Sequence, residues 1–280
     1  MMNYKLILAG IACALLFASN SQTAVRGSDH DLSAGGTAQA TTSATTEVCV
    51  FCHTPHGSNT AVSAPLWNKA SPATAYTRYS DLGTATLDGS EVTVGSVSLA
   101  CLSCHDGTQA MDVVVNAPGS GGWAAAGTEI DAVAISAMTN TGGAPIPMLG
   151  TDLRNDHPIS IAYAGGGCGV GVDPCTPSTG ATADRDFNDA QHATINGNSQ
   201  WWIDVASYDS TGDGIRDATG TADTREKSDM ILYTRDFTGV DGPSVECGSC
   251  HDPHEETARP VSFLRIANTN SDVCLACHIK

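Results

Sequence analysis

The chain has 280 residues, of which 30 are acidic and 13 are basic, so its formal net charge is −17. A surface this acidic repels nucleic acid and favours basic or metal-bearing partners. Only 5% of the residues are aromatic and 29 are glycine, so the sequence offers little large apolar material for a core of this size. We therefore expect another group to fill part of the interior.

Residues 1–24 have the pattern of a secretory signal peptide. Lys5 precedes the apolar stretch LILAGIACALLFA, which is shorter than a membrane-spanning helix requires. Cleavage is expected after Ala24, with Ala18 as the alternative, and a lipoprotein anchored through Cys13 is the competing interpretation. The mature chain is therefore expected to be exported to the periplasm or to the cell surface and beyond, where disulfides persist.

The first chemical motif is EVCVFCHTPHGS, residues 47–58. Cys49, Cys52 and His53 form a C-x-x-C-H unit, in which two thiols bond to a haem and the following histidine binds its iron. His56 lies three residues further on, behind a proline. Because the residue before a proline is pushed away from helical geometry, the helix should end near His53. His56 is then expected to ligate a neighbouring haem rather than its own.

Three more C-x-x-C-H units follow along the chain. A zinc site or a thioredoxin-like redox pair does not explain a histidine directly after the second cysteine in all four units. We therefore expect four covalently attached c-type haems. The attaching cysteines are Cys49, Cys52, Cys101, Cys104, Cys247, Cys250, Cys274 and Cys277, and the proximal iron ligands are His53, His105, His251 and His278.

Short strands are expected between the haem motifs. EVTVGSVSLA, residues 91–100, alternates like a strand that leads into the second motif. DVVVN (112–116) and DMILYT (229–234) are further candidates for short strands in a mostly irregular chain.

Residues 164–244 form an insertion rich in glycine, threonine and aspartate, of which we expect 164–228 to be a surface elaboration. Cys168 and Cys175 are the two cysteines that neither the motifs nor the signal peptide uses, and they are expected to form a disulfide. The stretch DSTGDGIRD resembles a calcium loop, although Gly220 stands where the bidentate carboxylate belongs, and a simple acidic turn is the alternative. The candidate calcium ligands are Asp209, Thr211, Asp213 and Asp217.

The first and last parts of the chain repeat each other, which indicates a duplicated two-haem unit. The matching stretches are SDHDLS (28–33) with NDHPIS (155–160), VCVFCHTPH (48–56) with ECGSCHDPH (246–254), and ACLSCH (100–105) with VCLACH (273–278). The chain therefore divides into the signal peptide 1–24, a first half 25–163 that includes the start of the second repeat, the insertion 164–244, and the second motif pair 245–280.

The repeat supplies four histidines outside the C-x-x-C-H units, enough for every iron to have histidine on both faces. The expected distal ligands are His30, His56, His157 and His254, and their assignment to particular irons stays open. The ninth histidine, His192, lies in a polar stretch and is not expected to bind iron. The alternative sulfur ligands are Met111, Met138, Met148 and Met230, none of which recurs between the halves.

The motifs and their surroundings resemble the doubled-CXXCH family of multihaem c-type cytochromes from metal-reducing bacteria. The resemblance rests on HDLS, CVFCHTPHG, APLWN, SLACLSCHDG, LGTDLRNDHPIS, VECGSCHDPH, FLR and CLACHIK, within residues 28–115, 149–163 and 245–280. Four haems on a loop-rich exported chain are also similar to the OmcE-like tetrahaem cytochromes that polymerise into nanowires. In those filaments one haem takes its distal histidine from the adjacent subunit. The resemblance therefore implies self-assembly, with His30 as the ligand that crosses the interface.

These expectations describe an exported electron-transfer protein rather than an enzyme, because iron with histidine on both faces has no open site for a substrate. The expected fold is that of a multihaem cytochrome c, mostly irregular, with short helices at the motifs, a few short strands and a core built around four haems. Its partners would be other redox proteins or extracellular acceptors. The alternatives are a soluble periplasmic shuttle, a subunit of a porin–cytochrome conduit, and a multihaem reductase of a small nitrogen compound.

Overall fold

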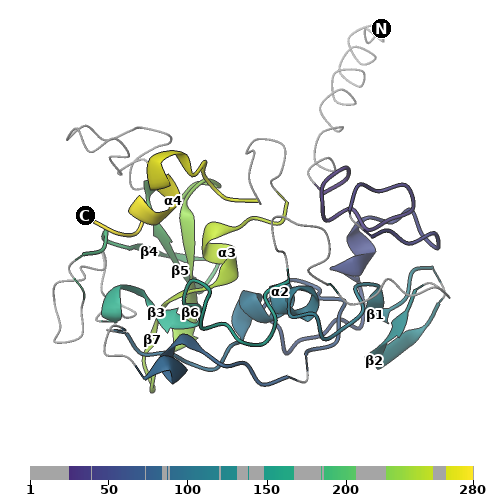
Figure 1. Ribbon diagram of the computed structural model, residues 1–280, viewed down its shortest axis with the longest axis horizontal. Coiled ribbons are helices and arrows are strands. Elements are labelled where there is room, and N and C mark those ends of the chain that lie inside the picture. The colour runs from purple at the N-terminus through teal and green to yellow at the C-terminus, as the bar shows by residue number, and fades with distance from the viewer. Residues whose placement is uncertain are drawn as a thin grey trace, which may run out of the picture.

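Two sheets and a set of short helices, connected by long loops, make up the computed structural model (Figure 1). It describes residues 25–38, 40–72, 74–83, 87, 89–119, 121–130, 138, 148–166, 184, 186–205, 225–254 and 263–279. Among these residues, no helix is both long and apolar enough to cross a membrane.

The larger sheet has five antiparallel strands in the order β3-β7-β6-β5-β4. Its strands are β3 (Ile161–Ala162), β4 (Gln191–Ile195), β5 (Asn198–Ile203), β6 (Met230–Asp236) and β7 (Asp241–Val245). The β4–β5 hairpin turns at Asn196 and Gly197, whose φ angles are 52° and 79°. Such Asn-Gly pairs are favoured in type I′ hairpin turns. The strand predicted over 229–234 is confirmed by β6.

The larger sheet also carries the largest cluster of buried side chains. Trp201, Ile203 and Met230 belong to this cluster together with Ala276 of the fourth motif. Trp201 and Ile203 lie in the segment that we expected to be a surface elaboration, and that expectation is wrong for residues 201–205, which are buried. The apolar run WWI is short and stands among polar residues, so the composition of the segment concealed its place in the core.

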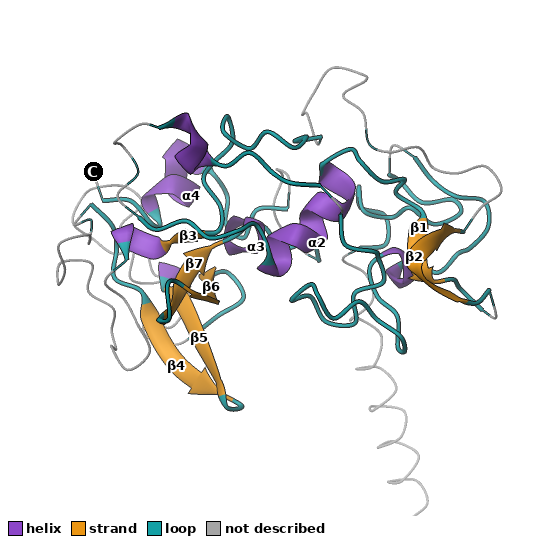
Figure 2. Cartoon of the chain, turned by 90° about the horizontal axis from the view of Figure 1, so that it is seen from below, coloured by secondary structure: helices purple, strands orange, loops and turns teal. Residues whose placement is uncertain are grey.

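The smaller sheet is a hairpin of β1 (Val113–Asn116) and β2 (Trp123–Glu129), with an irregular register between Val114 and Asn116. β1 confirms the strand predicted over 112–116. This hairpin lies at the opposite end of the molecule from the larger sheet, and α2 (Ser96–His105) lies between them (Figures 1 and 2).

A short helix carries or adjoins each of the four C-x-x-C-H units. These helices are η1 (Cys49–Phe51), α2, α3 (Cys247–Cys250) and α4 (Asp272–Leu275), and three further turns are η2 (Tyr79–Leu82), η3 (Tyr163–Gly165) and η5 (Thr269–Ser271). The strand predicted over 91–100 is wrong. Glu91 makes an isolated bridge with Ile161, but the chain becomes helical at Ser96. The helix buries Ala100 and Leu102, which an alternating strand would place on the same face as polar residues.

Candidate haem-binding site

The four motifs follow one another along the long axis of the molecule, with α2, α3 and α4 in this order from the smaller sheet toward the C-terminus (Figures 1 and 2). None of the eight motif cysteines is in a disulfide. Thiols of consecutive motifs interact electrostatically in three places: Cys52 with Cys104, Cys101 with Cys247, and Cys250 with Cys274 and Cys277. The cysteines therefore form one row that passes through the motifs in sequence order.

The environment of several of these thiols raises their pKa. Burial raises the pKa of Cys52 to about 12 and that of Cys250 to about 11. The thiol of Cys101 donates a hydrogen bond to Cys247, and this bond together with burial raises the pKa of Cys101 well above its usual value. Protonated thiols react slowly in thiol–disulfide exchange. Cys52, Cys101 and Cys250 are therefore poor nucleophiles, whereas the hydrogen bond from Cys101 lowers the pKa of Cys247.

The chain after the first motif folds back and pairs with it. The N–H of Thr54 donates to the carbonyl of Leu66 at 2.9 Å, and the N–H of Asn68 donates to the carbonyl of Cys52 at 2.9 Å. The side-chain amide of Asn68 also donates to the carbonyl of Val50, inside the motif, at 2.6 Å. Leu66 has a φ angle of 54°. These hydrogen bonds fix the backbone of the first motif against residues 66–68.

The third motif is held in the same way. The N–H of Asp252 donates to the carbonyl of Phe263 at 2.8 Å, and the N–H of Arg265 donates to the carbonyl of Cys250 at 2.8 Å. The guanidinium of Arg265 donates to the carbonyl of Gly248, inside the motif, at 2.9 Å. Phe263 has a φ angle of 59°. The sequence repeat is thus also a structural repeat. It extends beyond His56 and His254, because residues 66–68 of the first copy correspond to residues 263–265 of the second.

His254 of the third motif lies opposite His53, the proximal histidine of the first motif. The ring centroids are 6.0 Å apart and the ring planes are inclined by 16°. Nδ1 of His53 lies 2.7 Å from the carbonyl oxygen of Pro65. Because a carbonyl only accepts, Nδ1 carries the proton and Nε2 is left to bind a metal. Nδ1 of His254 lies 3.7 Å from Oδ1 of Asp252, which favours the same tautomer.

His30 lies opposite His105, the proximal histidine of the second motif. Their ring centroids are 6.2 Å apart and the planes are inclined by 74°. The ring of His30 also hydrogen-bonds the carbonyl of Pro253 and stacks on Phe263 at 4.2 Å. Burial lowers the pKa of His30 to about 4, so its imidazole is neutral. Within this chain His30 therefore lies at a motif of its own subunit, and a role across a subunit interface stays a prediction.

Both histidine pairs have the spacing of the axial ligands of a haem iron. A metal–nitrogen distance of about 2 Å on each side places the centroids of two imidazoles about 6 Å apart. A porphyrin supplies four nitrogens, so haem iron needs only two protein ligands, whereas a zinc site takes three or four. In the described part of the chain, no three or more His, Cys, Asp or Glu side chains gather to hold a metal ion. The residues therefore fit haem iron and do not fit zinc.

The other two candidate distal ligands, His56 and His157, are exposed. The side chains of Thr54 and Asn116 each donate to the carbonyl of His56 at 3.0 Å, which fixes its backbone. Nδ1 of His157 lies 3.0 Å from the carbonyl oxygen of Pro158, so Nε2 is again the available nitrogen. Neither ring contacts another histidine among the described residues. The distal ligands of the third and fourth irons therefore stay predictions.

His192, Met230 and Met148 lie outside the two histidine pairs. His192 lies on β4 with its ring centroid 4.2 Å from that of Trp201. Met230 is fully buried in the cluster of the larger sheet. Met148 lies beside the second motif. Gly107 follows this motif by two residues, and a Cβ added to Gly107 would lie 2.8 Å from the sulfur of Met148. The position opposite His105 is nevertheless occupied by His30, and this favours a nitrogen ligand over the sulfur of Met148 at the second motif.

Three sequence predictions fall outside the described residues. They are the signal peptide 1–24, the disulfide between Cys168 and Cys175, and the calcium ligands Asp209, Thr211, Asp213 and Asp217. All three stay predictions.

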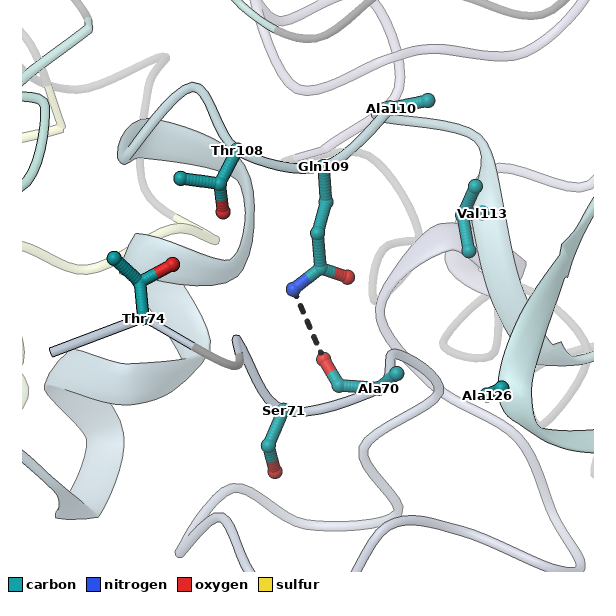
Figure 3. Close-up of a pocket in the computed structure, with 8 residues that line it drawn as sticks. All are labelled: Ala70, Ser71, Thr74, Thr108, Gln109, Ala110, Val113 and Ala126. Carbon is teal, nitrogen blue, oxygen red and sulfur yellow. Dashed lines mark hydrogen bonds between the residues drawn. The ribbon is translucent and has the colours of Figure 1, made fainter.

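A cavity of about 330 Å³ lies beside the loop that follows the second motif (Figure 3). It is lined by Ala70, Ser71, Thr74, Thr108, Gln109, Ala110, Val113 and Ala126. The only hydrogen bond drawn between these residues runs from the amide of Gln109 to the carbonyl of Ala70, at 3.5 Å. Reduction of a small nitrogen compound needs proton donors at the site. None of the eight lining residues is titratable.

One residue with a central structural role belongs to no motif. Glu246 is buried directly before the third motif, where Arg235 donates to its Oε1 at 2.8 Å and Ser98 of α2 donates to its Oε2 at 2.5 Å. The hydroxyl of Ser98 in turn accepts from the N–H of Cys247 at 3.0 Å. Glu246 thus joins the second and third motifs. The sequence shows only an acidic residue before a cysteine, and such a residue is usually exposed.

The family model of the doubled CXXCH motif matches residues 242–280, which contain the third and fourth motifs. No curated protein matches the chain. The matched cysteines and histidines indicate covalently bound c-type haem. With the histidine pairs at the first two motifs, this match supports the chain as a multihaem c-type cytochrome, a class of haem-binding electron-transfer proteins.

Proposed function

We propose that the chain is an exported tetrahaem cytochrome that carries electrons through closely spaced haems with histidine on both faces of each iron. The observation that carries the proposal is the spacing of the two histidine pairs, 6.0 and 6.2 Å between ring centroids. A haem bound in this way exchanges one electron and offers no open position to a substrate. The chain's own part is to hold, orient and shield the haems.

The row of cysteines supports transfer along the whole chain. Since each pair of cysteines tethers one haem, close thiols of consecutive motifs hold neighbouring haems near one another. Cys49 and Cys274 are the exposed members of the row and belong to its first and last motifs. The two ends of the row are therefore the places where a redox partner can approach most closely.

We extend the proposal to a filament at the cell surface, which rests on the resemblance to nanowire cytochromes. His254 is exposed but lies opposite His53, whereas His56 and His157 are exposed and their rings contact no other histidine among the described residues. A ligand shared between subunits is therefore better supplied by one of them than by His30, which lies opposite His105.

The proposal is tested on the purified native protein. A pyridine haemochrome assay with intact mass spectrometry counts the attached haems, and low-temperature EPR reports their spin states. Four haems, all low spin, are expected. A near-stoichiometric high-spin haem that binds CO when reduced would contradict the proposal and favour a reductase. Electron microscopy separates the forms of assembly, because ordered fibres support the filament and monodisperse monomers at high concentration identify a soluble shuttle.

A further inference from the structure

The loop Asp252–His254 belongs to the second half of the chain but lies at both motifs of the first half. Its last residue, His254, lies opposite His53 with ring centroids 6.0 Å apart. The carbonyl of its middle residue, Pro253, accepts a hydrogen bond from the ring of His30, which lies at the second motif. One loop thus contacts a candidate ligand at each of the first two irons.

We propose that this loop completes both haem sites of the first half, an inference that rests on the proposed function. His254 is the distal ligand at the first motif, and Asp252 is its positioning residue. Pro253, together with Phe263, positions His30 as the distal ligand at the second motif.

Asp252 contacts His254 at two points. Its Oδ1 accepts the backbone N–H of His254 at 2.9 Å and lies 3.7 Å from Nδ1 of the ring. A carboxylate near Nδ1 favours the tautomer that leaves Nε2 for iron and makes the imidazole a stronger donor. A stronger donor stabilises ferric iron and lowers its reduction potential. At the equivalent position of the first motif, the hydroxyl of Thr54 donates to the carbonyl of His56 instead.

Phe263 holds His30 from the other side. The two rings are nearly parallel, with 12° between their planes and 4.2 Å between their centroids. Phe263 is tied to the loop because its carbonyl accepts the N–H of Asp252 at 2.8 Å. Leu66 is the equivalent residue in the first half, and 52% of it is exposed. Phe263 therefore carries a contact from the second half to a candidate ligand of the first half.

The ligand assignment is tested with full-length, haem-loaded protein. His254→Ala should keep four attached haems and convert one of them from low spin to high spin. To identify that haem, the substitution is repeated in a Cys49→Ala/Cys52→Ala variant, which cannot attach the first haem. There, all three remaining haems should stay low spin. A new high-spin haem in this background would show that His254 serves another iron and would overturn the assignment.

His192→Ala is the matched control, because it removes a histidine outside both pairs, and it should leave every haem low spin in both backgrounds. If the three-haem variant does not fold, a crystal structure of the wild-type haem-loaded protein decides the same question. His254 on the iron that carries His53 supports the assignment, and any other residue there overturns it.

Asp252→Asn tests the positioning role without removing a haem. It should keep four low-spin haems and raise one of the four midpoint potentials, because the carboxylate no longer strengthens the donor. An effect of about tenfold in the ferric-to-ferrous ratio corresponds to about 59 mV for one electron. Loss of folding alone would not move one potential and spare three. Four unchanged potentials would overturn the role of Asp252.

Failure of the inference and failure of the proposed function give different results. A wild-type protein with a high-spin haem, or with fewer than four haems, contradicts the proposed function before any variant is made. A wild-type protein with four low-spin haems, combined with a His254→Ala variant that keeps all four low spin, contradicts only the inference.

Discussion

The substitution Glu246→Ala tests how the halves of the molecule are joined. Only 1% of Glu246 is exposed, and its carboxylate accepts hydrogen bonds from Arg235 at 2.8 Å and from Ser98 at 2.5 Å. Removing one partner of a buried ion pair costs about 3–5 kcal/mol. Because 18% of the Arg235 side chain is exposed, the expected loss of unfolding free energy is at the lower end, about 3 kcal/mol.

Glu246→Gln separates hydrogen bonding from charge. The amide has the same size, its oxygen can accept from Arg235, and its nitrogen can donate to Ser98. Burial raises the pKa of Glu246, although the hydrogen bond from Ser98 and the charge of Arg235 act in the opposite direction. The folded state therefore favours the neutral carboxyl more than the unfolded state does. Replacing it by a neutral amide should cost about 1 kcal/mol or less at neutral pH.

The pH dependence of this difference has a definite sign. A carboxyl whose pKa is raised by folding takes up a proton on folding between its unfolded pKa, about 4.3, and its higher folded pKa. Its contribution is fully present below the unfolded pKa and is lost as the pH rises through the folded pKa. The stability of the wild type relative to Glu246→Gln should therefore decrease as the pH rises through this window.

Urea unfolding of the haem-loaded proteins, followed by far-UV circular dichroism, measures these free energies. Asp152→Asn is the control, because it breaks an ion pair with Arg154 at the surface, and its midpoint should stay unchanged. Equal losses for Glu246→Ala and Glu246→Gln would refute the reasoning. A wild-type advantage over Glu246→Gln that grows with pH would refute it too.

Three further substitutions should reduce the unfolding free energy in the same urea assay. Tyr76→Phe removes a hydroxyl that donates to a buried aspartate at 2.7 Å, a charge-assisted bond worth about 1.5–3 kcal/mol. Lys69→Met leaves three carbonyls of the loop 110–113 without the buried ammonium that donates to them, at a cost of about 3 kcal/mol. Gly248→Ala forces a Cβ against the hydroxyl of Tyr233 and should cost about 1–3 kcal/mol, which Tyr233→Phe should partly restore. A loss below about 0.5 kcal/mol would contradict the contact behind each substitution.

Short sequence patterns predicted the structure correctly at positions where nearby residues determine the local conformation. The proline behind the third motif predicted that the helix ends near His251, and His251 has extended angles of φ −109° and ψ 139°. The strands at 112–116 and 229–234 were found from their β-branched and apolar residues. The strand over 91–100 was wrong because the alternating residues include glycine and serine, which gain little from a sheet face. At Ser96 the helix that carries the second motif begins instead.

The partners of the candidate iron ligands could not be predicted in the same way. The repeat predicted that His30 and His254 are distal iron ligands. His254 lies opposite His53, however, only when the two halves have folded together. Contacts between residues this far apart leave no periodic or local signal in one sequence. The core strand around Trp201 was missed for a related reason, because its burial depends on α4 covering the sheet rather than on its own neighbours.

The two copies of the repeat share their backbone contacts but differ in the side chains that contact the candidate distal histidines. Asp252 and Phe263 of the second copy supply a carboxylate to His254 and an aromatic ring to His30, whereas Thr54 and Leu66 of the first copy supply neither kind of group. On the proposed assignment, covalent attachment of the first two haems needs only local cysteines, but their distal ligation needs the loop Asp252–His254 in place. The first two irons should therefore become low spin only after the second half has folded. The spin state of these two haems would then show whether the two halves have packed together.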